Sequence, residues 1–340
     1  MLKPRRLRPG DTIATISPSW GCAGTNRVKW KYELGVRRLR ELGLDVVAAP
    51  NSMKGTSYLD KHPQARAEDL MWAFENQNVR AIIANIGGND SERLLPFLDP
   101  QVILRNPKIL CGYSDVLALH LYCHRLGLST FYGDNLLTVV AEAGGWHPYS
   151  RYWFQKVFFD SSPIGEIPPS PDWSCTPNNH TNPEHRKVYI PSDGYVRIQG
   201  SGRACGRLFG GHGCLNEYEH PGIVPVKSDF QNAIFFYEDI PKVCTADYIG
   251  CFFDWLGQNG FLQVLRGIII GKLPSPKDFT SYIEKIREVV SGRYGLSDLP
   301  ILCGLHFGHS SPICILPFGA PAVLNMDNLT FSISDSGVLA

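Results

Sequence analysis

The first third of the chain alternates between short apolar runs and longer segments with a helical stripe of hydrophobic residues. The apolar runs predict strands over 12–17, 44–49, 79–86, 108–113 and 129–132. The stripes between them predict helices over 26–43, 63–77, 91–98 and 115–126. Strands that alternate with helices at this spacing indicate a parallel, doubly wound sheet that helices cover on both faces.

The pattern changes about halfway along the chain. A stretch rich in Pro, Ser, Asn and Asp shows no sustained period, which is typical of a linker or a functional loop. Beyond it, strands are expected at 233–237 and 264–270, helices at 247–258 and 277–294, and a small sheet from 313–317, 320–325 and 329–334. We therefore predict an α/β protein with a flavodoxin-like N-terminal domain (1–160), a linker and substrate loop (161–204) and a smaller mixed α/β C-terminal domain (205–340).

Composition limits the class of protein further. Hydrophobic residues make up 44% of the 340 residues, which is enough for a sizeable core and excludes intrinsic disorder. The 33 basic and 32 acidic residues form no long run of one sign, so a nucleic acid polymer and an anionic membrane are not expected partners. Apolar runs are about five residues long, far short of a membrane span, and the N-terminus lacks the apolar stretch of a signal peptide. These features lead us to expect a cytoplasmic protein.

Ten cysteines stand in the chain without a CxxC pair among them. Several lie inside apolar runs such as KILCGY and PILCG, so free, buried thiols in a reducing compartment are expected rather than disulfides. The same spacing argues against a zinc cluster.

Ser114 is the first candidate for chemistry. It lies where an apolar strand turns directly into a helix, in Gly112-Tyr113-Ser114-Asp115. A nucleophilic serine needs this bend, because its hydroxyl must be accessible while an adjacent N–H stabilises the oxyanion. The alternative is a plain helix cap. Taken alone, the motif favours the cap, because Val116 occupies the position of the second glycine in GxSxG.

A second glycine turn, Gly87-Gly88, follows the strand 79–86. Paired glycines allow a ligand to approach the backbone and offer another oxyanion N–H, although an ordinary strand-to-helix turn has the same composition. The turn contains neither GxGxxG nor a GK[ST] ending, which disfavours a nucleotide-cofactor dehydrogenase.

Two further strand ends carry a carboxylate and an imidazole. Glu238 ends the apolar run AIFFY, and His309 follows PILCG in a Gly-His loop. Each alone is unremarkable. With Ser114 they give the order Ser, Glu, His, and a hydrolytic triad needs these three groups: a nucleophile, a base and an acid that orients the base.

Other histidines are open to two interpretations. His120 and His124 have the spacing of metal ligands on a helix, but no HExxH glutamate accompanies them, and a structural role is preferred. His212 stands among glycines in Gly210-Gly211-His212-Gly213, which fits either a ligand-binding loop or a simple turn.

Several motifs together resemble one known family. IGGNDSERLLPFLD, KILCGYSD, FFYEDI and FGHSSPICILPFGAPAVLN, supported by RPGDTIATISPS and CGRLFGGHGCLN, are similar to segments of the LD-carboxypeptidase and microcin C immunity (MccF-like) serine peptidases. The resemblance covers nearly the whole chain.

The resemblance implies a catalytic set. Ser114 corresponds to the nucleophile, His309 to the general base and Glu238 to the acid that orients it, while the backbone N–H groups of Gly88 and Asp115 correspond to the oxyanion hole. It also implies a homodimer that uses no metal and no cofactor.

Within that family the chain is more similar to the MccF-like branch, which implies cleavage of an amide bond in an aminoacyl- or peptidyl-nucleotide. Trp173, in a Trp-containing loop, is expected to stack on the base, and Lys242, shortly after the acid, to pair with a substrate carboxylate. His212 is a third expected substrate contact. The alternatives leave Trp173 on a mobile loop and Lys242 in solvent.

Two departures from the family pattern bear on the substrate. Asp134 stands where a proline is usual, and 210–214 extends the usual GGN or GGC. A murein tetrapeptide is therefore a second candidate substrate, and a non-catalytic ligand-binding protein is the alternative of a different class.

Overall fold

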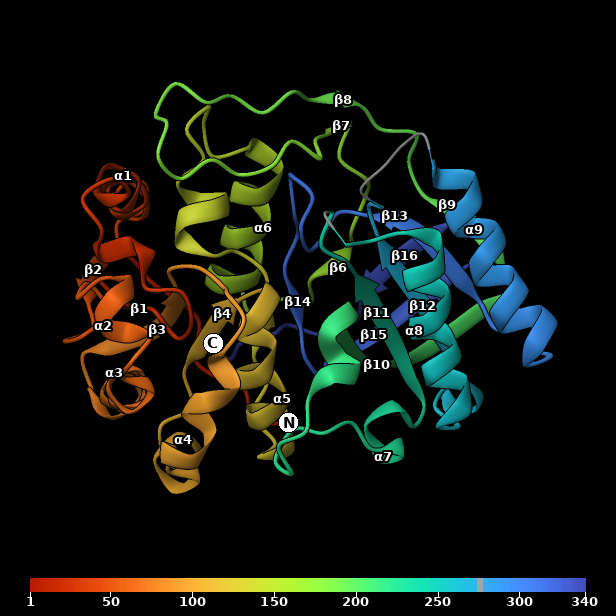
Figure 1. Cartoon of the computed structure of the whole chain (residues 1–340), viewed down its shortest axis with the longest axis horizontal. Coiled ribbons are helices and arrows are strands. Elements are labelled where there is room, and N and C mark those ends of the chain that lie inside the picture. The colour runs from red at the N-terminus through yellow and green to blue at the C-terminus, as the bar shows by residue number, and fades with distance from the viewer. Residues whose placement is uncertain (242, 274–277) are drawn as a thin grey trace.

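The structure is a computed structural model that describes residues 1–241, 243–273 and 278–340. Two sheets lie side by side, the first built mainly from the N-terminal half of the chain and the second from the C-terminal half (Figure 1). The segment that carries β7 and β8 runs across the top of both.

The first sheet has the strand order β14-β5-β4-β3-β1-β2. Its strands are β1 (Thr12–Ile16), β2 (Asp45–Ala48), β3 (Val79–Ala84), β4 (Ile109–Gly112), β5 (Phe131–Tyr132) and β14 (Leu316–Pro317). The first five strands are parallel, and their order 2-1-3-4-5 is that of flavodoxin-like sheets. The predicted doubly wound fold is confirmed. In such sheets ligands bind beyond the carboxyl ends of the strands.

The connections of the first sheet are mostly helical. They are η1 (Cys22–Gly24), α1 (Lys29–Arg40), α2 (Thr56–Leu59), α3 (Pro63–Glu75), η2 (Ser91–Phe97), α4 (Pro100–Arg105), η3 (Ser114–Val116), α5 (Leu117–Arg125), η4 (Leu136–Val140) and α6 (Pro148–Phe159). The helix predicted over 91–98 is a 3-10 helix instead of an α-helix. Pro96 lies inside it and has no N–H to donate to an α-helical bond.

The second sheet is mixed, with the order β6-β16-β15-β10-β11-β12-β13-β9. The strands are β6 (Gly165–Glu166), β9 (Val196–Gln199), β10 (Arg203–His212), β11 (Ala233–Glu238), β12 (Gly267–Gly271), β13 (Ile301–Leu305), β15 (Pro321–Asn325) and β16 (Thr330–Ile333). β10 to β13 are parallel, and antiparallel strands flank them on both sides. Its helices are η5 (Gly213–Glu217), α7 (Lys227–Phe230), α8 (Ala246–Gln258), η6 (Leu262–Val264), α9 (Phe279–Arg287) and η8 (Glu288–Arg293). Residue 277, the first of the predicted helix 277–294, lies outside the described residues.

The expected small sheet over 313–334 is partly wrong. β15 and β16 pair with each other, but β14 pairs antiparallel with β5, with Leu316 opposite Tyr132. A strand of two residues has no period that could assign it to a sheet. The C-terminal half of the chain therefore supplies the edge of the first sheet.

The polar stretch between the halves is tied into the structure at several points. β6 and β9 are edge strands of the second sheet, while β7 (Asp172–Trp173) and β8 (Ile190–Pro191) pair with each other. Backbone hydrogen bonds in both directions also join Ser174 to Ser311. We call this segment, residues 161–204, the strap, because it runs across both sheets.

One continuous hydrophobic core joins the two halves. Every residue of β4, β11 and β12 is buried, as expected for parallel strands covered on both faces. Tyr132 of the first sheet packs on Phe236 of the second, with ring centroids 5.4 Å apart. The shared core fixes the position of one sheet relative to the other.

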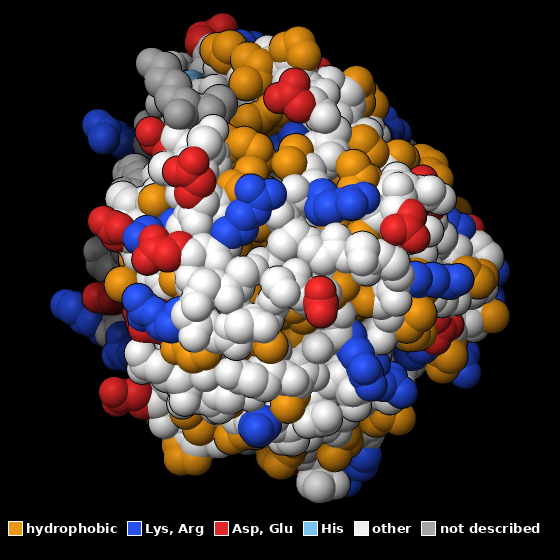
Figure 2. Space-filling view, turned by 90° about the vertical axis from the view of Figure 1, so that its right-hand side faces the viewer, with side chains coloured by type: hydrophobic (Ala, Val, Ile, Leu, Met, Phe, Trp, Pro, Cys, Tyr) orange, Lys and Arg blue, Asp and Glu red, His pale blue; other side chains and the backbone are white. Residues whose placement is uncertain are grey.

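Six of the ten cysteines are buried, whereas Cys205 and Cys251 are exposed, so the expectation of buried thiols fails at these two positions. On the face seen in Figure 2, basic and acidic side chains are interspersed, in keeping with the net charge of +1. Across the described ranges, none of the helices combines the length and the apolarity that a membrane crossing demands.

Candidate active site

Ser114 lies at a strained turn between β4 and α5. Its φ of 65° is in the left-handed region, which non-glycine residues rarely adopt. A Cβ on Gly87 would lie 2.9 Å from the Cβ of Ser114, so the glycine lets the neighbouring loop pass close to the serine. The turn presents the hydroxyl beyond the carboxyl end of the sheet, which is the geometry of a nucleophile elbow.

The second sheet brings an imidazole and a carboxylate to this hydroxyl. His309 Nε2 is 3.1 Å from Ser114 Oγ. On the other side of the ring, Nδ1 is 2.8 Å from Glu238 Oε2, and the backbone N–H of His309 donates to the same oxygen at 3.0 Å. Ser114, His309 and Glu238 thus form a hydrogen-bonded chain, as the sequence predicted that they would lie together.

Gly308 makes the approach of His309 to Glu238 possible. Its φ of 84° is left-handed, and a Cβ there would lie 2.2 Å from the Cδ of Glu238. The glycine therefore serves both the turn and the close contact.

Tyr132 is a member of the site that the sequence analysis did not identify. Its hydroxyl donates to Glu238 Oε1 at 2.5 Å and accepts from the backbone N–H of Ser114 at 3.3 Å. The signal was available in the sequence, because Tyr132 ends a predicted strand on the same edge of the sheet as Ser114.

The contact between His309 and Glu238 shifts the pKa of both groups. Burial lowers the pKa of His309, but the charge and hydrogen bonds of Glu238 more than offset this and raise it above its ordinary value of 6.5. Burial raises the pKa of Glu238, and His309 outweighs that effect, so the carboxyl pKa is lowered. The pair is therefore a carboxylate beside an imidazole of increased basicity.

The loop after β3 borders the hydroxyl. Asp115 holds it in place, because its Oδ2 accepts from the backbone N–H groups of Asp90 at 3.0 Å and Ser91 at 2.8 Å. Arg66, which is fully buried, makes two bonds to the Asp90 carboxylate at 2.7 and 2.8 Å. Within the described ranges the N–H of Gly88 donates to no protein group. That N–H is available to a ligand.

A hollow of about 190 Å³ opens beside Ser114. Its lining comes from both sheets and from the strap: Trp20, Ile86, Gly87, Gly88, Tyr113, Ser114, Asn135, Thr138, Asn178, His180 and His309. Trp20 is 42% exposed, and its ring meets that of His180 edge to face at 5.7 Å. This aromatic pair was not predicted from the sequence, although Trp20 directly follows the strand-end turn Pro18-Ser19.

The strap is anchored over this hollow from both sides. Lys187 pairs with Glu142 at 2.6 Å with both side chains buried, and Lys31 Nζ donates to the carbonyl of Asn179 at 3.1 Å. Toward the second sheet, the hydroxyls of Tyr189 and Ser311 are 2.9 Å apart. The strap therefore forms a fixed roof.

Of the three expected substrate contacts, the two that the structure describes, Trp173 and His212, do not line this hollow. Trp173 is buried in a separate hollow of about 100 Å³, where Lys272 Nζ is 5.3 Å from its ring centroid. His212 is also buried and does not line the hollow beside Ser114; its Nδ1 accepts from the N–H of Cys214, and its ring is 6.4 Å from that of His309. Lys242 lies outside the described residues. Trp173 thus lines a different hollow from the one beside Ser114, in which the expected stacking would take place.

His120 has a structural environment. Its ring nitrogens lie 2.9 Å from Thr130 Oγ1 and 2.8 Å from the carbonyl of Gly112, so it supports the end of β4 just before the elbow. Burial lowers its pKa to about 4. Nowhere in 1–241, 243–273 or 278–340 do three His, Cys, Asp or Glu side chains gather as they would to hold a metal ion.

A doubly wound sheet with a serine at its elbow, facing an imidazole–carboxylate pair, is the architecture of a serine hydrolase. Residues 13–133 match the model of the LD-carboxypeptidase N-terminal domain, and residues 205–324 match that of the C-terminal domain. The chain belongs to the LD-carboxypeptidase family and is a serine peptidase.

Relatives with different names match nearly its full length. The chain is 30% identical to YocD of Bacillus subtilis, named as a carboxypeptidase (92% of this chain, 93% of that protein). It is 29% identical to the microcin C7 self-immunity protein MccF of Escherichia coli (97% and 94%). It is 26% identical to a B. subtilis protein described as a probable murein peptide carboxypeptidase (99% and 95%).

Solved structures of MccF-like proteins are similar throughout. An MccF-like protein from Streptococcus pneumoniae in complex with AMP has a TM-score of 0.87 at 28% identity, covering 95% of this chain and 98% of that chain. MccF in complex with glutamyl sulfamoyl guanosine has a TM-score of 0.85 at 27% identity, with full coverage of both chains.

Substitution of Gly308 by alanine should disable the site. A Cβ at Gly308 must displace the Glu238 carboxylate, and displacement of a catalytic group by about 1 Å costs on the order of 10²-fold in rate. We expect kcat/KM of Gly308→Ala to fall by at least that factor in a steady-state assay.

Gly127→Ala is the matched control. Its φ of 85° is nearly the same, and nothing lies within 4 Å of a Cβ there, so only backbone strain of about 1 kcal/mol is added. Equal losses of activity in the two variants would contradict the steric role of Gly308.

Proposed function

We propose that the protein hydrolyses an amide bond with Ser114 as nucleophile, His309 as general base and Glu238 as the acid that orients the imidazole. The observation that carries this proposal is the unbroken chain of contacts, 3.1 Å from Ser114 Oγ to His309 Nε2 and 2.8 Å from Nδ1 to Glu238. Because Nδ1–H donates to the carboxylate, the free electron pair of Nε2 faces the serine.

In the proposed reaction Ser114 Oγ attacks the carbonyl carbon while His309 accepts its proton. The N–H groups of Gly88 and Asp115 stabilise the oxyanion, for which the N–H of Gly88 is suited because it donates to no other described residue. His309 then donates the proton to the leaving amine. Water next attacks the acyl group while His309 accepts a proton from it, and this proton passes to Ser114 Oγ as the acyl group leaves. Glu238 stabilises the transient imidazolium throughout.

For the substrate we propose an aminoacyl- or peptidyl-nucleotide of the microcin C type, with hydrolysis serving immunity or detoxification. Support comes from the MccF-like structures that hold AMP and glutamyl sulfamoyl guanosine. In this chain, the exposed ring of Trp20 beside His180 replaces Trp173 as the surface on which a nucleobase stacks. Stacking of this kind contributes about 1–3 kcal/mol per base.

A murein tetrapeptide is the second candidate substrate. The relative described as a probable murein peptide carboxypeptidase favours it, and such a peptide needs no aromatic platform. We further propose that the protein acts in the cytoplasm as a homodimer, the assembly that the family resemblance implies.

A fluorophosphonate probe tests the nucleophile. The wild type should form a covalent adduct on Ser114, detected by peptide mass spectrometry, and Ser114→Ala should form none. The same substitution should lower the hydrolysis rate by roughly 10⁴-fold or more. The exposed Ser201→Ala serves as control and should label and turn over like the wild type. Identical behaviour of Ser114→Ala and wild type would refute the mechanism.

The pH dependence tests the base and its partner. His309 must be neutral to accept a proton, so kcat/KM should decline as pH falls through a pKa that Glu238 holds above 6.5. In Glu238→Gln the raising influence is lost while burial remains, so the acid limb should move to lower pH as the maximal rate drops. Exposed Glu219→Gln should leave the profile in place. A limb that stays fixed in Glu238→Gln would exclude this ion pair as its origin.

A direct comparison of substrates tests the proposed specificity. Glutamyl sulfamoyl adenosine should be hydrolysed with higher kcat/KM than an L,D-tetrapeptide. Trp20→Ala should raise KM for the nucleotide by about 5- to 150-fold, Trp20→Phe should restore much of the affinity, and folded Trp173→Ala should keep the wild-type KM. Preference for the tetrapeptide, or a greater effect at Trp173, would overturn the assignment while leaving the triad intact.

A further inference from the structure

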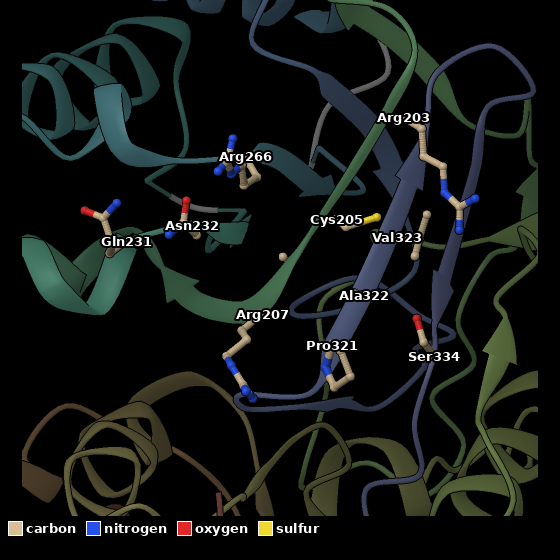
Figure 3. A pocket seen from close by; sticks show the side chains of 11 residues that line it. Arg203, Cys205, Arg207, Gln231, Asn232, Arg266, Pro321, Ala322, Val323 and Ser334 are labelled. Carbon is tan, nitrogen blue, oxygen red and sulfur yellow. The ribbon is translucent and has the colours of Figure 1, made fainter.

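A larger hollow lies at the opposite end of the C-terminal sheet from Ser114. It measures about 670 Å³ and is lined by the beginning of β10, by residues that precede β11 and β12, and by β15 (Figure 3). Arg203, Cys205 and Arg207 alternate along β10, so their side chains project from the same face of the sheet. This face of β10 is exposed at all three positions.

Three arginines make the hollow positively charged. The side chains of Arg203, Arg207 and Arg266 surround the thiol of Cys205 in Figure 3. No carboxylate occurs among the described lining residues, and none of the three arginines forms an ion pair with another described residue. Arg207 donates to the carbonyl of Gly319 at 3.1 Å, which fixes its direction.

The remaining polar groups are neutral. Gln231 and Asn232 contribute side-chain amides and Ser334 a hydroxyl, while Pro321 and Val323 form an apolar floor. The site therefore offers a concentration of positive charge and neutral hydrogen-bonding groups over a flat strand surface. Guanidinium groups bind phosphate oxygens in pairs of parallel hydrogen bonds, and several of them around one hollow select a ligand with several anionic oxygens.

We propose that this arginine hollow binds a small molecule that carries two or more phosphate groups. Its volume lies within the range of about 300–1,000 Å³ that is usual for small-ligand sites. Among the described residues that line it there is no aromatic side chain, so recognition rests on the phosphates rather than on a base.

The proposed site is distinct from the proposed catalytic centre. Arg207 pairs with Ala233 at the start of β11, whereas His212 pairs with Glu238 at its end. Five residues of strand separate the two positions, a distance of about 17 Å at 3.3 Å per residue. The inference therefore does not depend on the function proposed for Ser114.

Cys205 provides a local reporter for the test. Inorganic pyrophosphate is titrated onto the full-length protein, and alkylation of each cysteine by iodoacetamide is followed by peptide mass spectrometry. At ten times the Kd about nine-tenths of the sites are filled, so the rate at Cys205 should fall about tenfold. The rate at Cys251, which is exposed on α8, should not change. Added salt should weaken the protection, because exposed charges are screened.

Matched variants decide whether the arginines are responsible. Arg203→Gln/Arg207→Gln/Arg266→Gln should abolish protection. Arg8→Gln/Arg105→Gln/Arg151→Gln should retain it, because these three arginines are exposed and form no ion pair with another described residue. Ser114→Ala should also retain it. Absence of protection at millimolar pyrophosphate, loss of protection in the control triple variant or in Ser114→Ala, or stronger protection by citrate than by pyrophosphate would each overturn the proposal.

Discussion

A single buried phenol connects the two halves of the candidate active site. Tyr132 belongs to the first sheet, yet its hydroxyl is bonded both to the Ser114 amide of that sheet and to the Glu238 carboxylate of the second. If the sheets moved apart by more than a fraction of a hydrogen-bond length, the carboxylate would lose one of its partners in a buried setting, which is costly. The relative position of the sheets is therefore coupled to the alignment of serine, imidazole and acid.

The same constraint explains several local choices of residue. Ser114 adopts a left-handed conformation, which costs roughly 1–2 kcal/mol for a residue with a Cβ, and the packed surroundings must hold it there. Glycines stand where another chain segment passes close to the site, as at Gly87 and Gly308. The buried guanidinium of Arg66 secures the loop of Gly88 through Asp90. These features hold the reacting groups of the candidate site in place at the expense of local stability.

Periodicity was sufficient to predict the fold of the first sheet, because each parallel strand is a buried apolar run and each helix carries a stripe. It was insufficient for β14, whose two residues become a strand only through contact with β5. The candidate triad could be named from the sequence because Ser114, Glu238 and His309 follow predicted strands, where parallel sheets collect their functional groups, and because their motifs resemble those of the LD-carboxypeptidase family. The aromatic contact was not predicted. The place of Trp20 after a strand-end turn does not by itself show that its ring faces the hollow, or that β8 and Lys272 enclose the ring of Trp173. That distinction depends on how the strap folds back over the sheet.

The anchored strap also forms part of the entrance to the serine. Two residues of the strap, Asn178 and His180, are part of the wall of the hollow beside Ser114, so a group that enters the hollow meets the strap as well as the two sheets. The strap in turn is held by the Lys187–Glu142 ion pair and by the bond from Lys31 to Asn179. Replacing these anchors would therefore alter the entrance to the hollow while leaving the serine, the imidazole and the carboxylate in place.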